Sequence, residues 1–334
     1  MKTYSWILIT IISSTLIMPV NIYAYKYALG SCLDQDYKQP IWSSIKKENI
    51  DGFIFLGDNV YGDQPSGTLS KMKKAYQVQK TKLPNWLMNN EKEIQAIWDD
   101  HDYGINDGGK DYKLKKEAQK MFLKFWNISP SDPRSIREGT YFKKSKNIDG
   151  TGVEIIGLDT RYFRSKLIGK KNAYKPNMLP KATILGQEQW KWLERSMNQT
   201  NSSIIIILSS IQVLATDHPY EKWANFPLER KRLLNLISLA SNDKSIVVVS
   251  GDRHRAGIYK NDDFVEITAS SLNKPGSKNS ESDQLLIGST FPETNYGILD
   301  IEPKKSKITV SIHNLNGLVL NSHTIELPLE KTEA

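Results

Sequence analysis

Four short segments of the sequence place side chains that can bind metals directly after an apolar, strand-like run. The run GFIFL leads into GDNVYGD, EIQAI into WDDHDYGIND, SIVVVS into GDRHRAG, and KYALG into a serine and a cysteine. Ligands in open α/β sheets bind beyond the carboxyl ends of the strands, so these segments are expected to meet at one edge of the fold. The side chains concerned are Cys32, Asp58, Tyr61, Asp99, Asp100, His101, Asp102, Asn106, Asp252 and His254.

The mixture of side-chain types indicates a metal centre. Three carboxylates stand within the segment Asp99–Asp102, and they repel one another unless water or a cation offsets their charge. Carboxylate, phenol, thiol and imidazole groups together form a donor set for metal ions. Each segment alone has an ordinary explanation, because a Gly-Asp pair after a strand is often a turn and Asp252 could pair with a neighbouring arginine. The four segments together predict a metal site.

Cys32 is the only cysteine of the chain, so it has no intramolecular disulfide partner. It could be a metal ligand or an inert buried thiol. The sequence LGSC also loosely matches the motif at which lipoproteins are cleaved and acylated, but several polar residues separate it from the apolar run. Lipidation of Cys32 is therefore disfavoured, and the other two readings stay open at this point.

Strands and helices alternate along the chain and have to position these segments. Apolar and alternating runs predict strands at 25–30, 52–57, 93–98, 139–144, 153–158, 203–208, 245–250 and 263–268, then antiparallel strands at 296–301, 307–314 and 318–325. Amphipathic patterns predict helices at 41–48, 68–80, 113–126, 186–197 and 227–239. The predicted fold class is α/β, with mixed sheets covered by helices.

Residues 1–24 are typical of a secretory signal peptide, and residues 25–334 of one globular catalytic domain. A lysine precedes an apolar run too short for a membrane span, and Ala24 is the small residue before the cleavage point. No later run reaches the ~20 apolar residues that a span needs, so we expect a periplasmic or secreted protein without a transmembrane segment. The net charge of +8 does not by itself predict a nucleic-acid partner, and we expect a monomer.

Taken in order, the segments GSC, GDNVYGD, WDDHDYGIND, LDTR, SSIQ and SGDRH resemble the motifs of PhoD-type alkaline phosphatases. These enzymes are a branch of the calcineurin-like metallophosphoesterases. The resemblance spans nearly all of the mature chain. It implies a four-layer α/β/β/α sandwich of two mixed sheets with metals at the sheet edge, and it implies hydrolysis of phosphomonoesters or phosphodiesters.

The resemblance also implies which residues hold the metals. Asp58 would bridge two metals, Tyr61 would bind Fe³⁺ as a tyrosinate, and Cys32 would be a further iron ligand. Asp100 stands where the superfamily has an asparagine, and the extra carboxylate suits Ca²⁺, Mg²⁺ or Mn²⁺ at the second site better than zinc. The ligands implied in this way are Cys32, Asp58, Tyr61, Asp100, Asp252 and His254.

Three further residues are catalytic candidates. His101 is expected to protonate a leaving oxygen, and Asn106 follows it in the same loop. Arg161, in LDTR, could hold a phosphate oxygen or could be a structural ion-pair partner. Gln212 stands where the superfamily has a histidine, and His218 is expected near the mouth of the pocket. Whether Gln212 or His218 joins the site stays open.

The predicted function is an exported, metal-dependent phosphatase or phosphodiesterase that uses a metal-activated hydroxide. Two alternatives remain: a non-catalytic module that binds anionic polymers through structural Ca²⁺, and a phospholipase or nuclease on the same scaffold. Tyr61 and His101 speak against the first, because a structural calcium site needs neither a phenolate nor a proton donor. The loops at 166–181 and 272–287 carry no motif that selects the alcohol group of the substrate.

Overall fold

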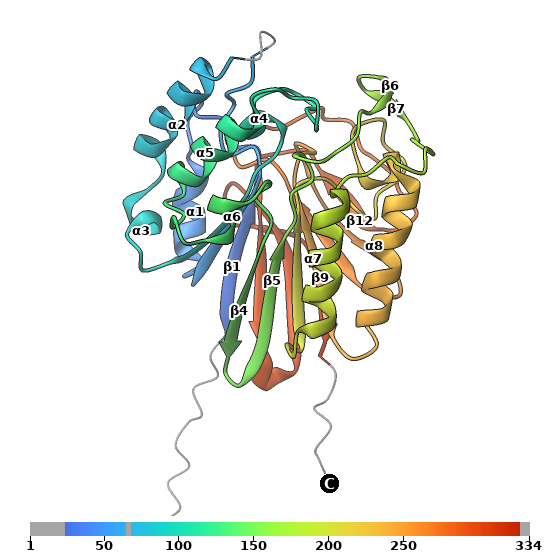
Figure 1. The fold of residues 1–334 in the computed structure, drawn as a ribbon. Helices are drawn as coiled ribbons and strands as arrows, with labels where there is room; N and C mark the ends of the chain where they lie inside the picture. Colours follow the sequence, from blue (N-terminus) through green and yellow to red (C-terminus); the bar gives the residue numbers. More distant parts are fainter. Residues whose placement is uncertain (1–23, 65–67, 328–334) are drawn as a thin grey trace, which may run out of the picture.

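The structure, a computed structural model, describes residues 24–64 and 68–327. The predicted signal segment lies outside these residues except for Ala24. Two mixed β-sheets pack face to face, and helices cover the outer face of each sheet (Figure 1). The four-layer α/β/β/α sandwich predicted from the sequence is therefore confirmed. None of the helices in the described part of the chain has the length and apolar character that crossing a membrane requires.

The first sheet has the strand order β15-β14-β13-β1-β2-β3. Strands β1, β2 and β3 run parallel, while β1 pairs antiparallel with β13, and β13, β14 and β15 form an antiparallel meander. Parallel neighbours require a crossover, and α1 supplies it between β1 and β2. The strands are β1 (Tyr25–Gly30), β2 (Gly52–Leu56), β3 (Glu93–Ile97), β13 (Asn295–Glu302), β14 (Lys307–Asn314) and β15 (Val319–Glu326).

The second sheet has the order β12-β10-β11-β9-β8-β5-β4. Its central strands β5, β8, β9 and β11 are parallel, and β4, β10 and β12 are antiparallel to their neighbours. The strands are β4 (Phe142–Ile148), β5 (Thr151–Gly157), β8 (Ile204–Ser209), β9 (Ser245–Ser250), β10 (Ala256–Lys260), β11 (Val265–Ala269) and β12 (Leu286–Phe291). A separate short hairpin joins β6 (Ile168–Lys170) to β7 (Ala173–Lys175).

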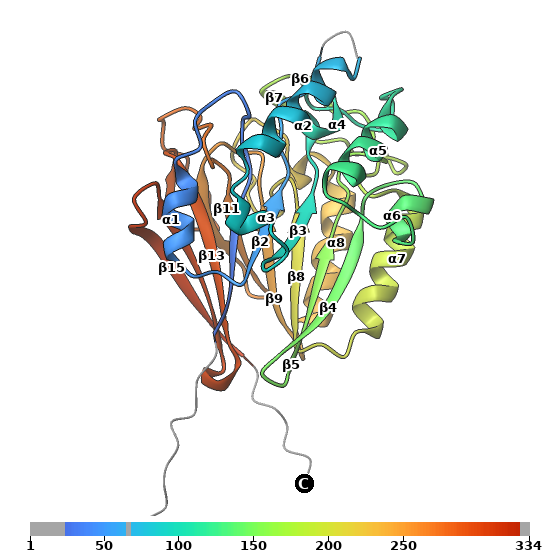
Figure 2. The ribbon, with the colours of Figure 1, turned by 90° about the vertical axis from the view of Figure 1, so that its left-hand side faces the viewer.

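Three buried clusters hold the four layers together. The apolar side chains between the sheets come from both of them, for example Leu29 and Ile54 from the first and Ile206 and Val249 from the second. Helices α1, α3 and α5 pack on the first sheet, and α7 and α8 pack on the second (Figure 2). The helices are α1 (Ile41–Lys47), α2 (Ser70–Lys82), α3 (Asn85–Met88), α4 (Asp100–Tyr103), α5 (Lys115–Phe125), α6 (Pro133–Ile136), α7 (Gly186–Gln199) and α8 (Pro227–Ala240).

Several element predictions from the sequence need correction. The strand predicted at 139–144 lies at 142–148, because Gly139 has a φ of 85° and Thr140 is held by Asp159 instead of by a neighbouring strand. The strands at 256–260 and 286–291 and the hairpin at 168–175 were not predicted. Their short and interrupted apolar patterns do not stand out from loop sequence.

Candidate metal centre

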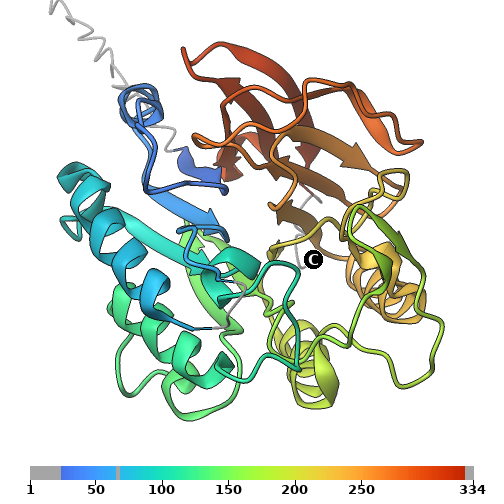
Figure 3. The same ribbon diagram turned by 90° about the horizontal axis from the view of Figure 1, so that it is seen from above.

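The loops that follow β1, β2, β3 and β9 meet at one end of the sandwich, as the sequence predicts (Figure 3). Two glycines permit this close approach. A Cβ atom on Gly57 would lie 2.5 Å from the Cβ of Asp99, and one on Gly251 would lie 2.6 Å from Oγ of Ser31. Larger residues at either position would push the loops apart.

Four of the predicted ligands have strained backbone conformations. The φ angles of Cys32, Asp58, Asp252 and His254 are 56°, 50°, 66° and 52°. Residues other than glycine seldom adopt positive φ, and such residues cluster at active sites, where the surrounding structure holds them in place. The backbone thus aims these four side chains into one space at a conformational cost.

One group of ligands, which we call the thiol end, comprises Cys32, Asp58, Tyr61 and His254. The Sγ atom of Cys32 lies 3.5 Å from Oδ2 of Asp58, and the hydroxyl of Tyr61 donates to the same oxygen at 3.1 Å. The Tyr61 hydroxyl lies 3.5 Å from Nε2 of His254. Because Nδ1 of His254 donates to the carbonyl oxygen of Lys274 at 2.6 Å, Nε2 is left free of its proton to bind a metal.

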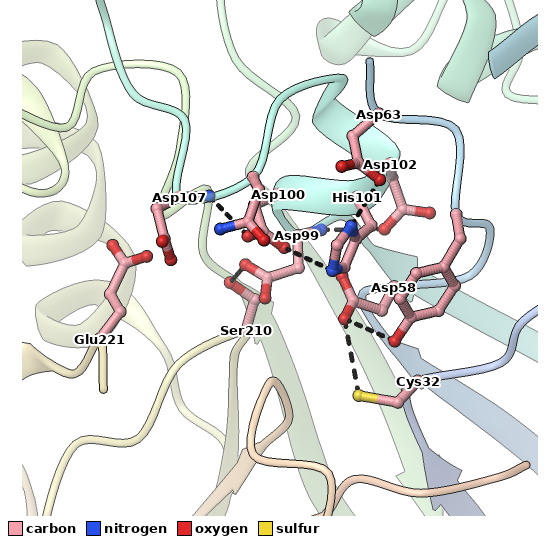
Figure 4. A network of polar contacts seen from close by, with 12 residues as sticks. Cys32, Asp58, Asp63, Asp99, Asp100, His101, Asp102, Asp107, Ser210 and Glu221 are labelled. Carbon is pink, nitrogen blue, oxygen red and sulfur yellow. Dashed lines mark hydrogen bonds and ion pairs between the residues drawn. The ribbon is translucent and has the colours of Figure 1, made fainter. Parts of the chain in front are cut away.

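A second group, the carboxylate end, comprises Asp99, Asp100 and Asp252. One oxygen from each lies within 4.8 Å of the others, and Asp58, Asp100 and His101 form a further cluster of the same size. The backbone N–H of Asp107 donates to Asp100 Oδ2 at 2.7 Å. Figure 4 shows Asp58 between Cys32 and Asp100, and Asp58 shares a cluster with each of them, so it links the thiol end to the carboxylate end.

Burial and mutual repulsion make negative charge unfavourable at several groups of this site, whereas at Asp100 the effect of burial is outweighed by His101 and Arg161, which lower its pKa. Burial, and then the charges of Asp99 and Asp100, raise the pKa of Asp252 well above its usual range. Burial also raises the pKa of Asp58 strongly, although His101 counteracts part of the shift. Burial and the nearby Asp58 raise the pKa of the Cys32 thiol. A cation bound among these groups would reverse each of the upward shifts.

Unpartnered buried oxygens give a second test of whether this donor set fits metal ions. Within residues 24–64 and 68–327, Asp58 Oδ1, Asp99 Oδ2 and Asp100 Oδ1 are buried and lack a hydrogen-bond partner. Buried carboxylate oxygens without a donor are costly, and a metal ion would satisfy all three. The residues present therefore fit a metal centre with two adjoining positions.

His101 lies beside the site with a fixed orientation. Its Nδ1 is 2.7 Å from Oδ1 of Asp63, its Nε2 is 4.0 Å from Oδ1 of Asp100, and its ring lies against that of Tyr61 with centroids 4.2 Å apart. Burial would lower the pKa of His101, but Asp100, Asp58 and Asp63 outweigh it and raise the pKa well above the usual value. The side chain can therefore carry a proton into the pocket.

Arg161 is entirely buried, and its contacts are those of a structural ion pair. Its guanidinium contacts Asp99 Oδ1 at 2.5 Å and Glu221 Oε2 at 2.5 Å. Glu221 also contacts Nε of Arg164 at 2.8 Å. Of the two roles that the sequence offered for Arg161, these contacts match ion pairing, and the side chain is inaccessible to solvent.

The remaining candidates, Asn106, Gln212 and His218, have different surroundings. Asn106 lines a pocket of about 260 Å³ together with Asp100, His101 and His254. Gln212 is buried and donates to Thr268 Oγ1, and its Oε1 is a further buried oxygen without a hydrogen-bond partner. His218 belongs to none of the ligand clusters in the described chain and lines a separate cavity of about 470 Å³.

Sequence reasoning did not identify three residues that shape the site. Asp63 orients His101, although it belongs to the quoted GDNVYGD segment. Ser210 lies 2.5 Å from Asp99 Oδ1, and Ser270 lies 3.1 Å from the Cys32 sulfur while accepting the N–H of His254 at 2.9 Å. Ser210 stands in the quoted SSIQ segment but was assigned no role there, and no sequence signal marks Ser270, because serines after a strand are common.

Comparison with solved structures places the sandwich among metallophosphoesterase-like folds. PhoD shares 16% identity over 92% of this chain and 69% of its own, with a TM-score of 0.66. GAP50, described as the anchor in the inner membrane complex of Plasmodium, shares 14% over 92% and 90%, with a TM-score of 0.61. Purple acid phosphatase PPD1 from yellow lupin shares 10% over 91% and 54%, with a TM-score of 0.57.

The family is established by sequence. A family model described as PhoD-like phosphatase matches residues 27–310, so the chain belongs to the PhoD-like phosphatases. No curated protein matches the sequence. Membership in this family makes the protein a metal-dependent phosphoric ester hydrolase, and the family resemblance seen in the sequence motifs is confirmed.

Proposed function

We propose that the protein is exported and hydrolyses phosphate esters with a metal-activated hydroxide, using two metal ions at the strand ends. Cys32, Asp58, Tyr61 and His254 would hold Fe³⁺, and Asp58, Asp100 and Asp252 would hold Ca²⁺, Mn²⁺ or Mg²⁺. The observation that carries this proposal is the pair of adjoining donor clusters that share Asp58, with unpartnered buried oxygens on Asp58 and Asp100.

Bound cations would supply Lewis acidity for the phosphate oxygens and would lower the pKa of a bound water. The protein's own residues form the substrate pocket and select the two metals. The pocket of about 260 Å³ is large enough for a phosphate group with a small alcohol, and Asp100, Asn106 and His254 line its wall. Oxygen ligands at one end and thiol and phenol ligands at the other would distinguish a hard divalent ion from a ferric ion.

His101 would supply the proton for the leaving alcohol. Its Nδ1 is engaged by Asp63 at 2.7 Å, so the other ring nitrogen, Nε2, is the one available on the Asp100 side. A positioned imidazolium speeds departure of a poor leaving group by roughly 10²–10⁴-fold. Asp63 would act as a positioning residue by fixing the ring and its tautomer.

Export is part of the proposal. Cleavage after Ala24 would leave β1 whole, since that strand begins at Tyr25. We also propose a monomer without a stable nucleic-acid partner, and a single catalytic domain over residues 25–334. N-terminal sequencing of protein recovered from outside the cytoplasm should begin at Tyr25. Uncleaved protein in the cytoplasm, or a lipid on Cys32, would contradict this part.

The decisive experiment is metal analysis of purified protein combined with a panel of phosphomonoesters and phosphodiesters. We expect iron and one divalent metal, with ester hydrolysis that is lost on chelation and restored by adding both metals. Calcium alone with no turnover would instead favour the structural calcium module. Activity confined to nucleic acid or phospholipid would favour the nuclease or phospholipase alternative on this scaffold.

A further inference from the structure

A second cavity, of about 610 Å³, adjoins the catalytic pocket. The two cavities share four lining residues, so they are neighbours in space. Those shared residues are Asn106, Asp107, Lys171 and Tyr174. A substrate whose phosphate lies beside His101 could therefore extend from the first cavity into the second.

The β6–β7 hairpin forms the boundary between the two cavities, at the same end of the molecule as α4 (Figure 1). It is tied to the loop after α4 by two hydrogen bonds. The hydroxyl of Tyr174 donates to Asp107 Oδ2 at 2.6 Å, and Nζ of Lys171 donates to Asn106 Oδ1 at 2.9 Å. These contacts hold the hairpin against the loop that directly follows α4, the helix that carries Asp100 and His101.

Lysine side chains on the wall of the second cavity have no ion-pair partner among the described residues, although two carboxylates also line this cavity. Lys113 and Lys166 are exposed on its wall, and no ion pair among the described residues involves either of them or Lys171. Arg164 also lines the cavity, but its guanidinium is occupied by Glu221 at 2.8 Å and by the carbonyl of Gly108 at 2.7 Å. Lys113, Lys166 and Lys171 therefore have no counterion in the described chain, although Lys171 already donates to the neutral amide of Asn106.

The apolar lining fits the same kind of ligand, while the two carboxylates of the wall offset part of its positive charge. Asp107 accepts the Tyr174 hydroxyl, and Asp111 is the other carboxylate on the wall. Ile105, Tyr112 and Leu167 supply apolar surface between the charged groups. A chain of carbon atoms carrying a second negative charge would match this combination, because its apolar part could lie on these side chains while the charge faces the lysines.

We infer that the second cavity is an anion subsite for the alcohol part of the substrate. The preferred substrates are then phosphate esters whose alcohol carries a second anionic group, such as another phosphate or a carboxylate. This inference rests on the proposed function, because it assigns the phosphate to the neighbouring catalytic pocket. Lys113, Lys166 and Lys171 would be the specificity-determining residues.

Binding tests the subsite without turnover. The probes are α,ω-alkane bisphosphonates with spacers of increasing length, each compared by calorimetry with the monophosphonate of the same chain length on the metal-loaded protein. At one spacer length we expect about tenfold tighter binding of the bisphosphonate at low salt, since three screened lysines each contribute a small attraction. The preference should shrink as ionic strength rises.

Two variants test which lysines cause the preference for the bisphosphonate. The double variant Lys113→Met, Lys166→Met should bring the affinity ratio close to one, because both side chains line only the second cavity. Lys170→Met is the matched control and should keep the affinity ratio. Lys170 is exposed at the end of β6 in the β6–β7 hairpin, but it lines neither cavity. The kcat/KM ratio between ω-phosphoalkanoates and alkyl phosphates should change in the same way.

The outcomes separate this inference from the proposed function. Turnover of both substrate types with no preference at any spacer length would overturn the subsite and leave the hydrolase intact. A spacer-dependent binding preference without any turnover would support the subsite and count against the hydrolase. An equal loss of the bisphosphonate preference in the double variant and in Lys170→Met would show only a general effect of surface charge. This result would also overturn the subsite.

Discussion

The two ends of the metal centre balance their charge in different ways. At the carboxylate end, Asp99 has an internal counterion, because the buried Arg161 guanidinium contacts it at 2.5 Å. At the thiol end, Asp58 takes part in no ion pair with a lysine or arginine of the described residues. Its neighbours there are the uncharged thiol of Cys32 and phenol of Tyr61, at 3.5 and 3.1 Å.

This difference indicates which end of the site needs a bound metal ion to carry negative charge. The carboxylate end is already partly neutralised by the protein, while the thiol end becomes anionic only if a cation stabilises the thiolate and phenolate. Asp58 shares one cluster with Cys32 and another with Asp100, so it couples the two positions. Variants at Asp58, at the thiol end and at Arg161 should therefore have distinct effects.

The largest effect is expected for Asp58→Ala. Both proposed metals lose a shared ligand, so kcat/KM should fall by at least about 10⁴-fold, equivalent to about 5.5 kcal/mol. Elemental analysis should show both metals depleted. Asp262→Ala, which removes an exposed carboxylate outside the site, is the control and should retain metal and rate. Retention of both metals in Asp58→Ala would contradict its bridging position.

The next effect concerns His101, which lies beside both ends. His101→Ala should keep both metals and lose roughly 10²–10⁴-fold in kcat for alkyl phosphates. The loss should be much smaller for nitrophenyl phosphate, because a good leaving group needs little protonation. Asp63→Asn should reproduce a milder version of this pattern, since it only loosens the ring. Equal losses for both leaving groups would instead mean that His101 orients a ligand or the phosphate.

The comparison also shows what the sequence could predict. Strand-end position was enough to bring Cys32, Asp58 and Asp100 together, because β1, β2 and β3 are parallel neighbours and share a carboxyl edge, whereas Asp252 follows β9 of the other sheet. The sandwich and the family were also predictable, from the order of the motifs. The metal identities and the role of each ligand stay predictions, since no observation of the structure tests them.

What the sequence could not predict are contacts between residues far apart in the chain. Glu221 pairs with Arg161 across sixty positions, and nothing near Glu221 resembles a site motif. Ser270 reaches Cys32 from the end of β11, across 238 positions. The first pair joins the loops after two neighbouring strands of the second sheet, β5 and β8, and the second joins the two sheets. Local periodicity carries no information about either placement.

Arg161→Met tests whether the carboxylate end is held by a structural ion pair. The change leaves Asp99 and Glu221 buried without their partner, so the free energy of unfolding should fall by about 3–5 kcal/mol. Urea denaturation of the metal-free protein measures this loss. Arg161→Lys should recover part of it, because a charge is restored without the forked geometry. A raised KM with unchanged stability would instead favour a phosphate-binding role for Arg161.

The smallest effect is expected at the thiol end, and it concerns metal choice more than rate. Cys32→Ser replaces a soft donor by a weak oxygen donor, so iron affinity should fall by about 10–100-fold while the divalent metal at the carboxylate end is retained. Tyr61→Phe should remove a visible charge-transfer band that iron-loaded protein shows, and Tyr37→Phe, at an exposed tyrosine outside the ligand clusters, should keep it. Because Asp58 and His254 remain in both variants, activity with excess iron should fall by less than about tenfold. A colourless, iron-free protein with full activity would show that the thiol end does not hold iron, and Cys32 would then be an inert buried thiol beside a site made of carboxylates.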